Sequence, residues 1–287
     1  MTWKKITRIR YSGCDRNTYQ QDIVIHRSEG ISEEVLENGL RIWHIYLGED
    51  GCNDHYTDIL FSTPYLKNAP YHKLDTYTAE SATFRVRLEN ATLSGTLSIY
   101  HNSTTKTTPS LPHDTYLFFD GFENGLHPDW IYQGTSEQII AAPSITNISQ
   151  CLEARGYRSG SWGTTYWSTS RTLEFPDHPV RIEANARSFS SEGYPGYGAV
   201  GIDDTTYVAY HANTAWHPVS IPSYHNTGTH TLKLLVYAYW HTGNWPYWWD
   251  DIIIRSSSEN PPTMLSVKTS NNITRSGVSF GTANMIG

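Results

Sequence analysis

The residues with the clearest chemical potential form an aromatic run at positions 237–249. Aromatic faces stack on the apolar faces of sugar rings, and rings beside polar groups make adhesive surfaces. Gly243, Asn244 and Pro246 indicate an exposed turn within this run. We therefore expect a loop that projects its rings outward, with core packing as the competing interpretation. The predicted ligand contacts of the run are Trp240, Trp245, Tyr247 and Trp248.

Two further segments, 156–167 and 190–197, mix Gly, Ser, Tyr and Trp in the same way. Rigid aromatic side chains among small adaptable polar ones are typical of recognition loops. We expect both segments to line the same end of a sandwich as the aromatic run. Their predicted ligand contacts are Trp162, Trp167, Tyr194 and Tyr197.

Four carboxylates at the predicted first and last strands of the second region suggest a metal site. These strands are commonly neighbours in a jelly roll, and Ca²⁺ prefers such oxygen ligands. The predicted ligands of a structural calcium ion are Asp120, Glu123, Asp250 and Asp251. The alternative is that they are solvated carboxylates at strand ends. The 13 His are scattered without paired spacing, so we expect no zinc site.

Catalytic patterns are weak. Glu153, Glu174 and Glu183 fall on separate predicted strands with no diagnostic spacing. The sequence contains no nucleophile elbow, phosphate-binding loop or dinucleotide fingerprint. We predict no catalytic residues and no enzymatic activity. A glycoside hydrolase or polysaccharide lyase built on a jelly roll stays open as the alternative.

Short alternating segments separated by turn signals predict strands in both halves of the chain. Only residues 31–38, which end before Gly39, have helix-like charge and spacing. The predicted fold class is all-β, with two β-sandwich domains. The expected organisation is a small sandwich at 1–102, a Pro-, Ser- and Thr-rich linker at 103–114, a jelly roll at 115–256, and a tail or added strand at 257–287.

The composition of the chain argues against several classes of binding partner. The 287 residues carry a formal charge of −7, which argues against nucleic acid because phosphate recognition needs a basic face. No run approaches the roughly 18 apolar residues of a membrane span. The three cysteines, Cys14, Cys52 and Cys151, are too few for a disulfide scaffold. They are expected to be buried free thiols, or to include a Cys14–Cys52 bridge.

The first residues have no apolar stretch like that of a secretory signal. The composition, with few charges and many Thr, Tyr and Trp, nevertheless suits an exposed setting. A virion protein made without export would reconcile the two observations, and so would a fragment of an extracellular or cell-surface protein.

Three segments of the first region resemble the DUF2341 family, a small β-sandwich module. They are Trp3-Lys4-Lys5-Ile6, the stretch ending Asn17-Thr18-Tyr19-Gln20, and Gly51-Cys52-Asn53-Asp54-His55-Tyr56-Thr57-Asp58-Ile59-Leu60-Phe61. Leu60 departs from the family's usual Arg, and Tyr77-Thr78 stands where a Tyr-Trp pair is usual. The resemblance implies a surface protein of archaeal, bacterial or viral type, and it implies no catalytic activity.

The second region resembles concanavalin-like and carbohydrate-binding jelly-roll modules. The resemblance lies in Phe118-Phe119-Asp120-Gly121-Phe122-Glu123 at its entry and Trp249-Asp250-Asp251-Ile252-Ile253-Ile254-Arg255 at its close. It implies a module that binds glycan or another cell-surface polymer.

Together these patterns predict a non-catalytic surface-recognition protein, such as a viral or phage tail fibre or spike, or a surface adhesin. Weak contacts by single sites favour display in several copies, so we expect a homo-oligomer, and a trimer suits a fibre. A purely structural virion protein is the other alternative.

Overall fold

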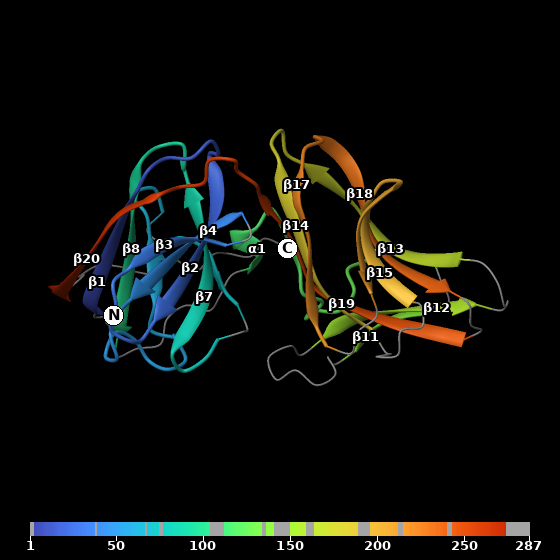
Figure 1. The fold of residues 1–287 in the computed structure, drawn as a ribbon, viewed down its shortest axis with the longest axis horizontal. Coiled ribbons are helices and arrows are strands. Elements are labelled where there is room, and N and C mark those ends of the chain that lie inside the picture. Colours follow the sequence, from blue (N-terminus) through green and yellow to red (C-terminus); the bar gives the residue numbers. More distant parts are fainter. Residues whose placement is uncertain are drawn as a thin grey trace. The chain divides into compact units, whose positions relative to one another are not determined.

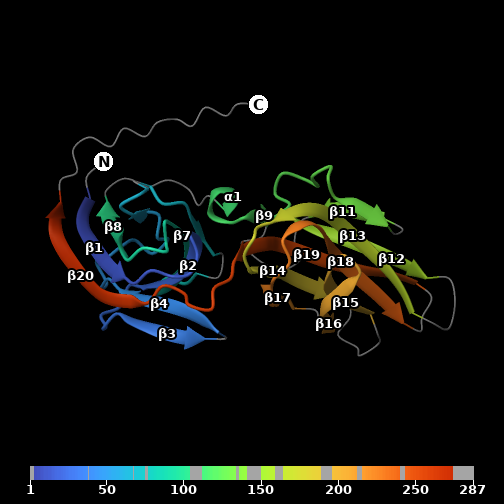
Figure 2. The same ribbon diagram turned by 90° about the horizontal axis from the view of Figure 1, so that it is seen from above.

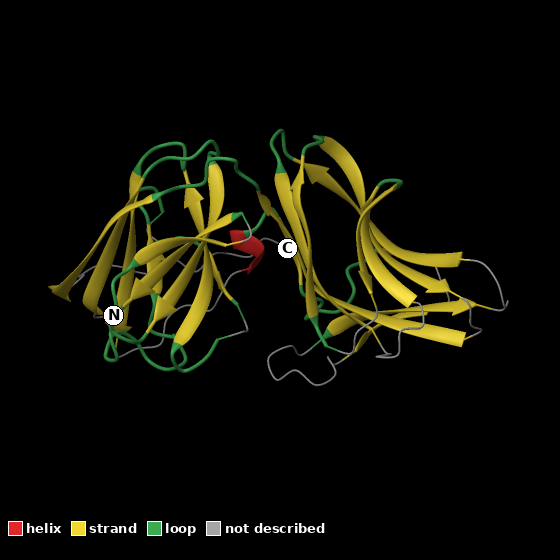
Figure 3. Ribbon diagram, in the orientation of Figure 1, coloured by secondary structure: helices red, strands yellow, loops and turns green. Residues whose placement is uncertain are grey.

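The computed structural model describes residues 3–37, 39–66, 68–74, 77–103, 112–133, 136–140, 150–158, 164–188, 196–211, 215–239 and 243–273. The chain divides into two compact units, Met1–Thr115 together with Ser258–Gly287, and Tyr116–Ser257. Nearly every regular element is a strand (Figures 1 and 3). The predicted all-β sandwich class is therefore confirmed.

The first unit contains a four-stranded and a five-stranded sheet. The first sheet runs in the order β20 (Met264–Ile273), β1 (Trp3–Tyr11), β8 (Gly95–Ser103), β5 (Leu60–Ser62). The second runs in the order β3 (Glu33–Glu37), β4 (Leu40–Tyr46), β2 (Thr18–His26), β7 (Ser81–Glu89), β6 (Tyr71–Lys73). All pairs are antiparallel except β2 with β4.

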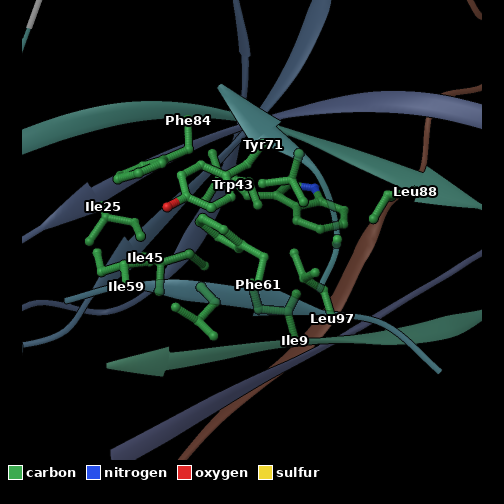
Figure 4. Packing of buried hydrophobic residues seen from close by; sticks show 14 of the residues in the cluster. Ile9, Ile25, Trp43, Ile45, Ile59, Phe61, Tyr71, Phe84, Leu88 and Leu97 are labelled. Carbon is green, nitrogen blue, oxygen red and sulfur yellow. The ribbon is translucent and has the colours of Figure 1, made fainter. Parts of the chain in front are cut away.

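Strict alternation along β7 shows why these strands pack as a sandwich. Every second residue of Ser81–Glu89 is buried, so one face of the strand enters the core and the other faces outward. Phe84 on this strand packs against Phe61 and Tyr71, with ring centroids 5.3 and 5.8 Å away. Trp43 is fully buried in the same cluster, which Figure 4 shows at close range.

The helix predicted at residues 31–38 is wrong, because Glu33–Glu37 form strand β3. The side chain of Glu34 explains the difference. Its carboxylate accepts hydrogen bonds from Arg41 (2.5 Å) and from the indole nitrogen of Trp43 (3.1 Å), both on β4. These cross-strand contacts outweigh the helix-like charge spacing. Gly39, with φ of +76°, lies in the β3–β4 connection instead of capping a helix.

Residues 264–273 return to the first unit as β20, which pairs antiparallel with β1 (Figure 2). The hydroxyls of Thr7 and Thr269 lie 2.9 Å apart across this pair. Residues 274–287 of the predicted tail lie outside the described residues. Of the predicted linker, residues 104–111 also lie outside them, and Pro112–Thr115 form the short helix α1.

The second unit is a sandwich of two antiparallel sheets. The β19 sheet has the order β11 (Ser136–Ile140), β12 (Cys151–Arg158), β19 (Gly243–Ser256), β14 (Val180–Ser188), β17 (His217–Tyr224), and β9 (Phe118–Asp120) also pairs with β19. The β18 sheet has the order β10 (Ile131–Gln133), β13 (Thr164–Phe175), β18 (Gly228–Tyr239), β15 (Gly196–Ile202), β16 (Thr205–His211).

All three cysteines are buried free thiols, so Cys14 and Cys52 are not bridged. Burial raises the pKa of Cys52 and that of Cys151 to about 12. Such thiols act as small core residues. Within the described ranges, no helix has the length and apolar character needed to cross a membrane.

Candidate functional site

The aromatic run is a strand, and the predicted projecting loop at 243–249 is wrong. Strand β19 begins at Gly243 and pairs with β12 along its first half, from Gly243 to Trp249. Strand β14 joins on the other side only from Tyr247 onward. Pro246 therefore lies opposite Arg155 of β12, where β14 does not reach. A proline is tolerated at this position because β14 does not pair with β19 there, so a backbone N–H is not required on that side.

Tyr247 is a core residue, which corrects its predicted role as a ligand contact. It is 2% exposed, and its ring centroid lies 5.5 Å from that of the fully buried Trp249. Across the sandwich, a Cβ on Gly198 would lie only 2.4 Å from the Tyr247 ring. The close approach of β15 to these rings therefore requires glycine. A ring enclosed in this way has no face to offer a sugar.

Trp248 points to the opposite, outer face of the β19 sheet, yet it too is buried at 8% exposure. Its indole nitrogen donates a 2.9 Å hydrogen bond to Glu153, which is itself 3% exposed. The Arg187 guanidinium carbon lies 5.8 Å from its ring. The register aligns these three residues across β12, β19 and β14. Trp248 is thus an anchored part of the sheet, and the expected outward exposure is wrong for it.

The carboxylate of Asp120 holds the two sheets of the second unit together. One oxygen accepts from the Phe122 backbone N–H at 3.0 Å. The other accepts from the Trp130 indole at 2.8 Å and lies 3.4 Å from the Arg171 guanidinium. These bonds satisfy the buried charge without a metal ion.

The other three predicted calcium ligands also accept hydrogen bonds from protein groups. Asp251, with φ of +47°, accepts from the Asn185 side chain at 3.1 Å, and Asp250 accepts from the Asp251 N–H at 2.8 Å. Glu123 accepts from the Gln150 N–H at 3.3 Å. Among the described residues, no three His, Cys, Asp or Glu side chains gather as a metal site requires. The calcium site stays a prediction.

The glutamates considered for catalysis have separate structural partners. Glu183 accepts from Arg181 at 2.7 Å and from the buried Arg255 at 2.9 Å. Glu174, on β13 in the other sheet, accepts from the Thr229 hydroxyl. With Glu153 bonded to Trp248, none of these described contacts joins two of the three carboxylates. Each of the three carboxylates therefore has a structural hydrogen-bond partner of its own.

The remaining predicted ligand residues are only partly described. Trp162, Tyr194 and Trp240 lie outside the described residues. Trp167, Tyr197 and Trp245 lie within β13, β15 and β19, where the structure describes the backbone. Their place in the strand register is therefore known.

That register brings together three tyrosines, which we call the tyrosine row. Tyr237 on β18 lies opposite Tyr166 on β13 and opposite Tyr197 on β15. His211 on β16 continues the row beside Tyr197. Sequence reasoning selected only Tyr197. The signal that was available is a Tyr in each of three strand segments, but their alignment depends on pairing that the sequence does not state.

The tyrosine row belongs to the outer face of the β18 sheet. Leu234 and Val236 enter the core, so alternation assigns Leu235 and Tyr237 to the outer face. One step from the row, Leu235 is 5% exposed. Further along this face, Thr172 and Glu174 are exposed. The row thus continues into a polar, hydroxyl-bearing surface.

No family model matches the chain, and no curated protein matches it. Solved structures resemble it distantly. A family 61 carbohydrate-binding module in complex with β-1,4-galactotriose is 16% identical with a TM-score of 0.36, covering 48% of this chain and 94% of the module.

A tandem of family 22 carbohydrate-binding modules from Paenibacillus barcinonensis is 13% identical with a TM-score of 0.39, covering 90% of this chain and 80% of the tandem. The K1 cleaved adhesin domain of Lys-gingipain from Porphyromonas gingivalis is also 13% identical, with a TM-score of 0.36, covering 49% of this chain and 98% of that domain. Likenesses this low carry no argument about the ligand of this chain.

Proposed function

We propose that this chain is a non-catalytic recognition protein whose second unit binds glycan along the outer face of the β18 sheet. The observation that carries the proposal is the tyrosine row, which the register extends across β13, β18 and β15. Tyrosine combines an apolar face, suited to stacking on a sugar ring, with a hydroxyl that hydrogen-bonds. Neighbouring strands lie about 5 Å apart, so the row occupies three adjacent strand positions.

Exposure differs between parts of the two outer faces. On the outer face of the β19 sheet, Glu153, Trp248, Asp250 and Arg255 are all between 1% and 8% exposed. On the β18 sheet, Leu235 and Ser168 are 5% and 6% exposed next to the row, whereas Thr172 and Glu174 further along are exposed and the edge residue Ile131 is 61% exposed. A chain of sugars would therefore lie over the row and extend toward this exposed part of the face.

Polar groups further along the same face supply hydrogen-bond partners for sugar hydroxyls. Ser170 pairs in register with Lys233, and the Thr172 and Thr231 hydroxyls lie 3.5 Å apart on the same face. Hydroxyl and ammonium groups exchange water for sugar at small net gain. Binding at one site is therefore weak, and display of several copies on a virion or cell surface would raise the avidity.

Affinity electrophoresis against soluble polysaccharides, followed by calorimetry on any that bind, tests the proposal. We expect Tyr237→Ala to weaken binding about tenfold through lost stacking and contact area, and Tyr237→Phe to retain most of it. Tyr65→Ala is the control, because Tyr65 is an exposed tyrosine of the first unit.

Unchanged binding by Tyr237→Ala and Tyr197→Ala, with both variants folded, would remove the tyrosine row from the ligand site. Failure of the parent chain to retain any polysaccharide would overturn glycan recognition and favour a purely structural role. Release of new reducing ends would overturn the non-catalytic assignment.

A further inference from the structure

A cavity of about 600 Å³ opens at one end of the first unit, separate from the tyrosine row. Lys4 and Lys5 line it from the start of β1, and Arg27 lines it from just beyond the end of β2. Asn102 and Ser103, at the end of β8, form another wall. Its volume lies within the range of small-molecule sites, roughly 300–1,000 Å³.

The cations of this cavity have unused hydrogen-bonding capacity. Lys4, Lys5 and Arg27 form no salt bridge within the described part of the chain. One terminal nitrogen of Arg27 donates to the Ala79 carbonyl at 3.0 Å, while its Nε is buried without a partner. Its other terminal nitrogen forms no hydrogen bond within the described part of the chain, so that nitrogen can donate to an acceptor on a ligand. The cavity therefore favours an anionic group near Arg27 and Lys5.

Hydrogen bonds hold the opposite wall in place. Asp58 is 4% exposed and accepts from the Asn53 backbone N–H at 2.9 Å. Burial raises the pKa of the Asp58 carboxyl, and this backbone bond counteracts the rise. The side chain of Asn102, a residue with φ of +56°, donates to the Asp50 carbonyl at 2.6 Å. The wall is thus fixed before any ligand enters, which reduces the entropy lost on binding.

The lining is too mixed for a simple anion site. Glu49, Asp50 and Asn53 contribute hydrogen-bond acceptors to the same cavity as the three cations. A neutral sugar would satisfy the acceptors through its hydroxyls but would bring no counter-charge to Arg27 and Lys5. An inorganic anion would satisfy Arg27 and leave most of the volume to water.

We propose that this cavity binds a saccharide that carries a carboxylate, of the uronic acid class. The carboxylate lies between Arg27 and Lys5, where the guanidinium and the ammonium donate charge-assisted hydrogen bonds to it. Ring hydroxyls donate to the Glu49 and Asp50 carboxylates and hydrogen-bond to the Asn53 and Ser103 side of the cavity. The proposal concerns the first unit and does not depend on the tyrosine row.

Calorimetry or ligand-observed NMR on the full chain tests this with three probes: glucuronic acid, glucose and inorganic phosphate. We expect glucuronic acid to bind and both other probes to bind at least tenfold more weakly. Arg27→Gln and Lys5→Gln should each lower the affinity for glucuronic acid about tenfold or more, the loss typical of a charge-assisted hydrogen bond. Arg8→Gln is the control, because Arg8 is exposed on the same strand as Lys5.

Equal binding of glucose and glucuronic acid, or full affinity in both Gln variants, would overturn the proposal. Phosphate that binds as tightly as glucuronic acid would also overturn it, because the site would then select charge alone. Melting curves distinguish lost binding from misfolding. If Arg27→Gln does not fold, Lys5→Gln still tests whether a cation of the cavity binds the carboxylate. Tyr237→Ala should leave glucuronic acid binding unchanged, which distinguishes this site from the proposed polysaccharide surface.

Discussion

Replacing Trp248 with Phe separates the structural role of this residue from the ligand role that its sequence context predicts. The substitution removes the indole N–H that donates to Glu153 at 2.9 Å. It leaves a carboxylate at 3% exposure without that donor. Loss of a hydrogen bond to a charged group costs about 1.5–3 kcal/mol, and the smaller ring leaves unfilled space worth about 1 kcal/mol more. We therefore expect the second unit to lose about 2.5–4 kcal/mol of unfolding free energy.

Differential scanning calorimetry can follow this loss, because two compact units can give two transitions. At roughly 2–4 °C per kcal/mol for a domain of this size, the transition of the second unit should fall by roughly 5–16 °C. The transition of the first unit is the internal control. Glu153→Gln, which removes the charge but keeps an acceptor for the indole, shows how much of the loss depends on the charge of the carboxylate.

Two outcomes would refute the reasoning. An unchanged transition in Trp248→Phe would show that the Glu153 contact contributes nothing to stability. Unchanged stability with lost polysaccharide binding would restore Trp248 as an outward ligand contact and would contradict its burial.

Three further predictions concern other described residues. The carboxylate of Asp203, 2.8 Å from His230, raises the pKa of His230. The free energy of unfolding that protonated His230 contributes is therefore present at low pH and lost as the pH rises through that pKa. Asp203→Asn should reduce the difference in unfolding free energy between pH 5.5 and pH 8. The Cys52 thiol, with a pKa of about 12 against 9.0, should alkylate roughly 1,000-fold more slowly in the folded chain at pH 8 than in urea, measured by mass spectrometry. Removing residues 258–287 deletes β20 and should destabilise the first unit by about 3 kcal/mol or more, seen in its calorimetric transition.

Each of these has a contrary result. An unaltered pH profile in Asp203→Asn would assign the pH dependence to other groups. Equal alkylation rates in buffer and urea would show that Cys52 is accessible and that its pKa is not raised. A truncated chain that melts at the parent temperature would show that β20 is dispensable.

Period-two alternation predicted the long strands well. The alternation can be read in the sequences of β4 and β7, because each strand buries one face against a single core. The helix at 31–38 failed because its local charge pattern competes with contacts from Glu34 to another strand. Such long-range contacts are absent from any local pattern.

Predicting the site failed for a different reason. Alternation identifies which residues leave the core, but it does not say whether the outer face is covered, as it is at Trp248. A bulge at Asp250 and Asp251 also breaks the parity, so Trp249 and Ile252 both enter the core although they are three residues apart. The alignment of the tyrosine row depends on strand pairing, which only the folded chain reveals.

The pairing of β20 with β1 makes the second unit an insertion within the first. A ribosome therefore completes Tyr116–Ser257 before it releases the strand that finishes the first sheet. During that interval the β1 backbone has no pairing partner on one edge. It can therefore pair with the β20 of another nascent copy. Early folding of the inserted unit would hold its own two ends together and raise the local concentration of the correct β20 over that of its competitors.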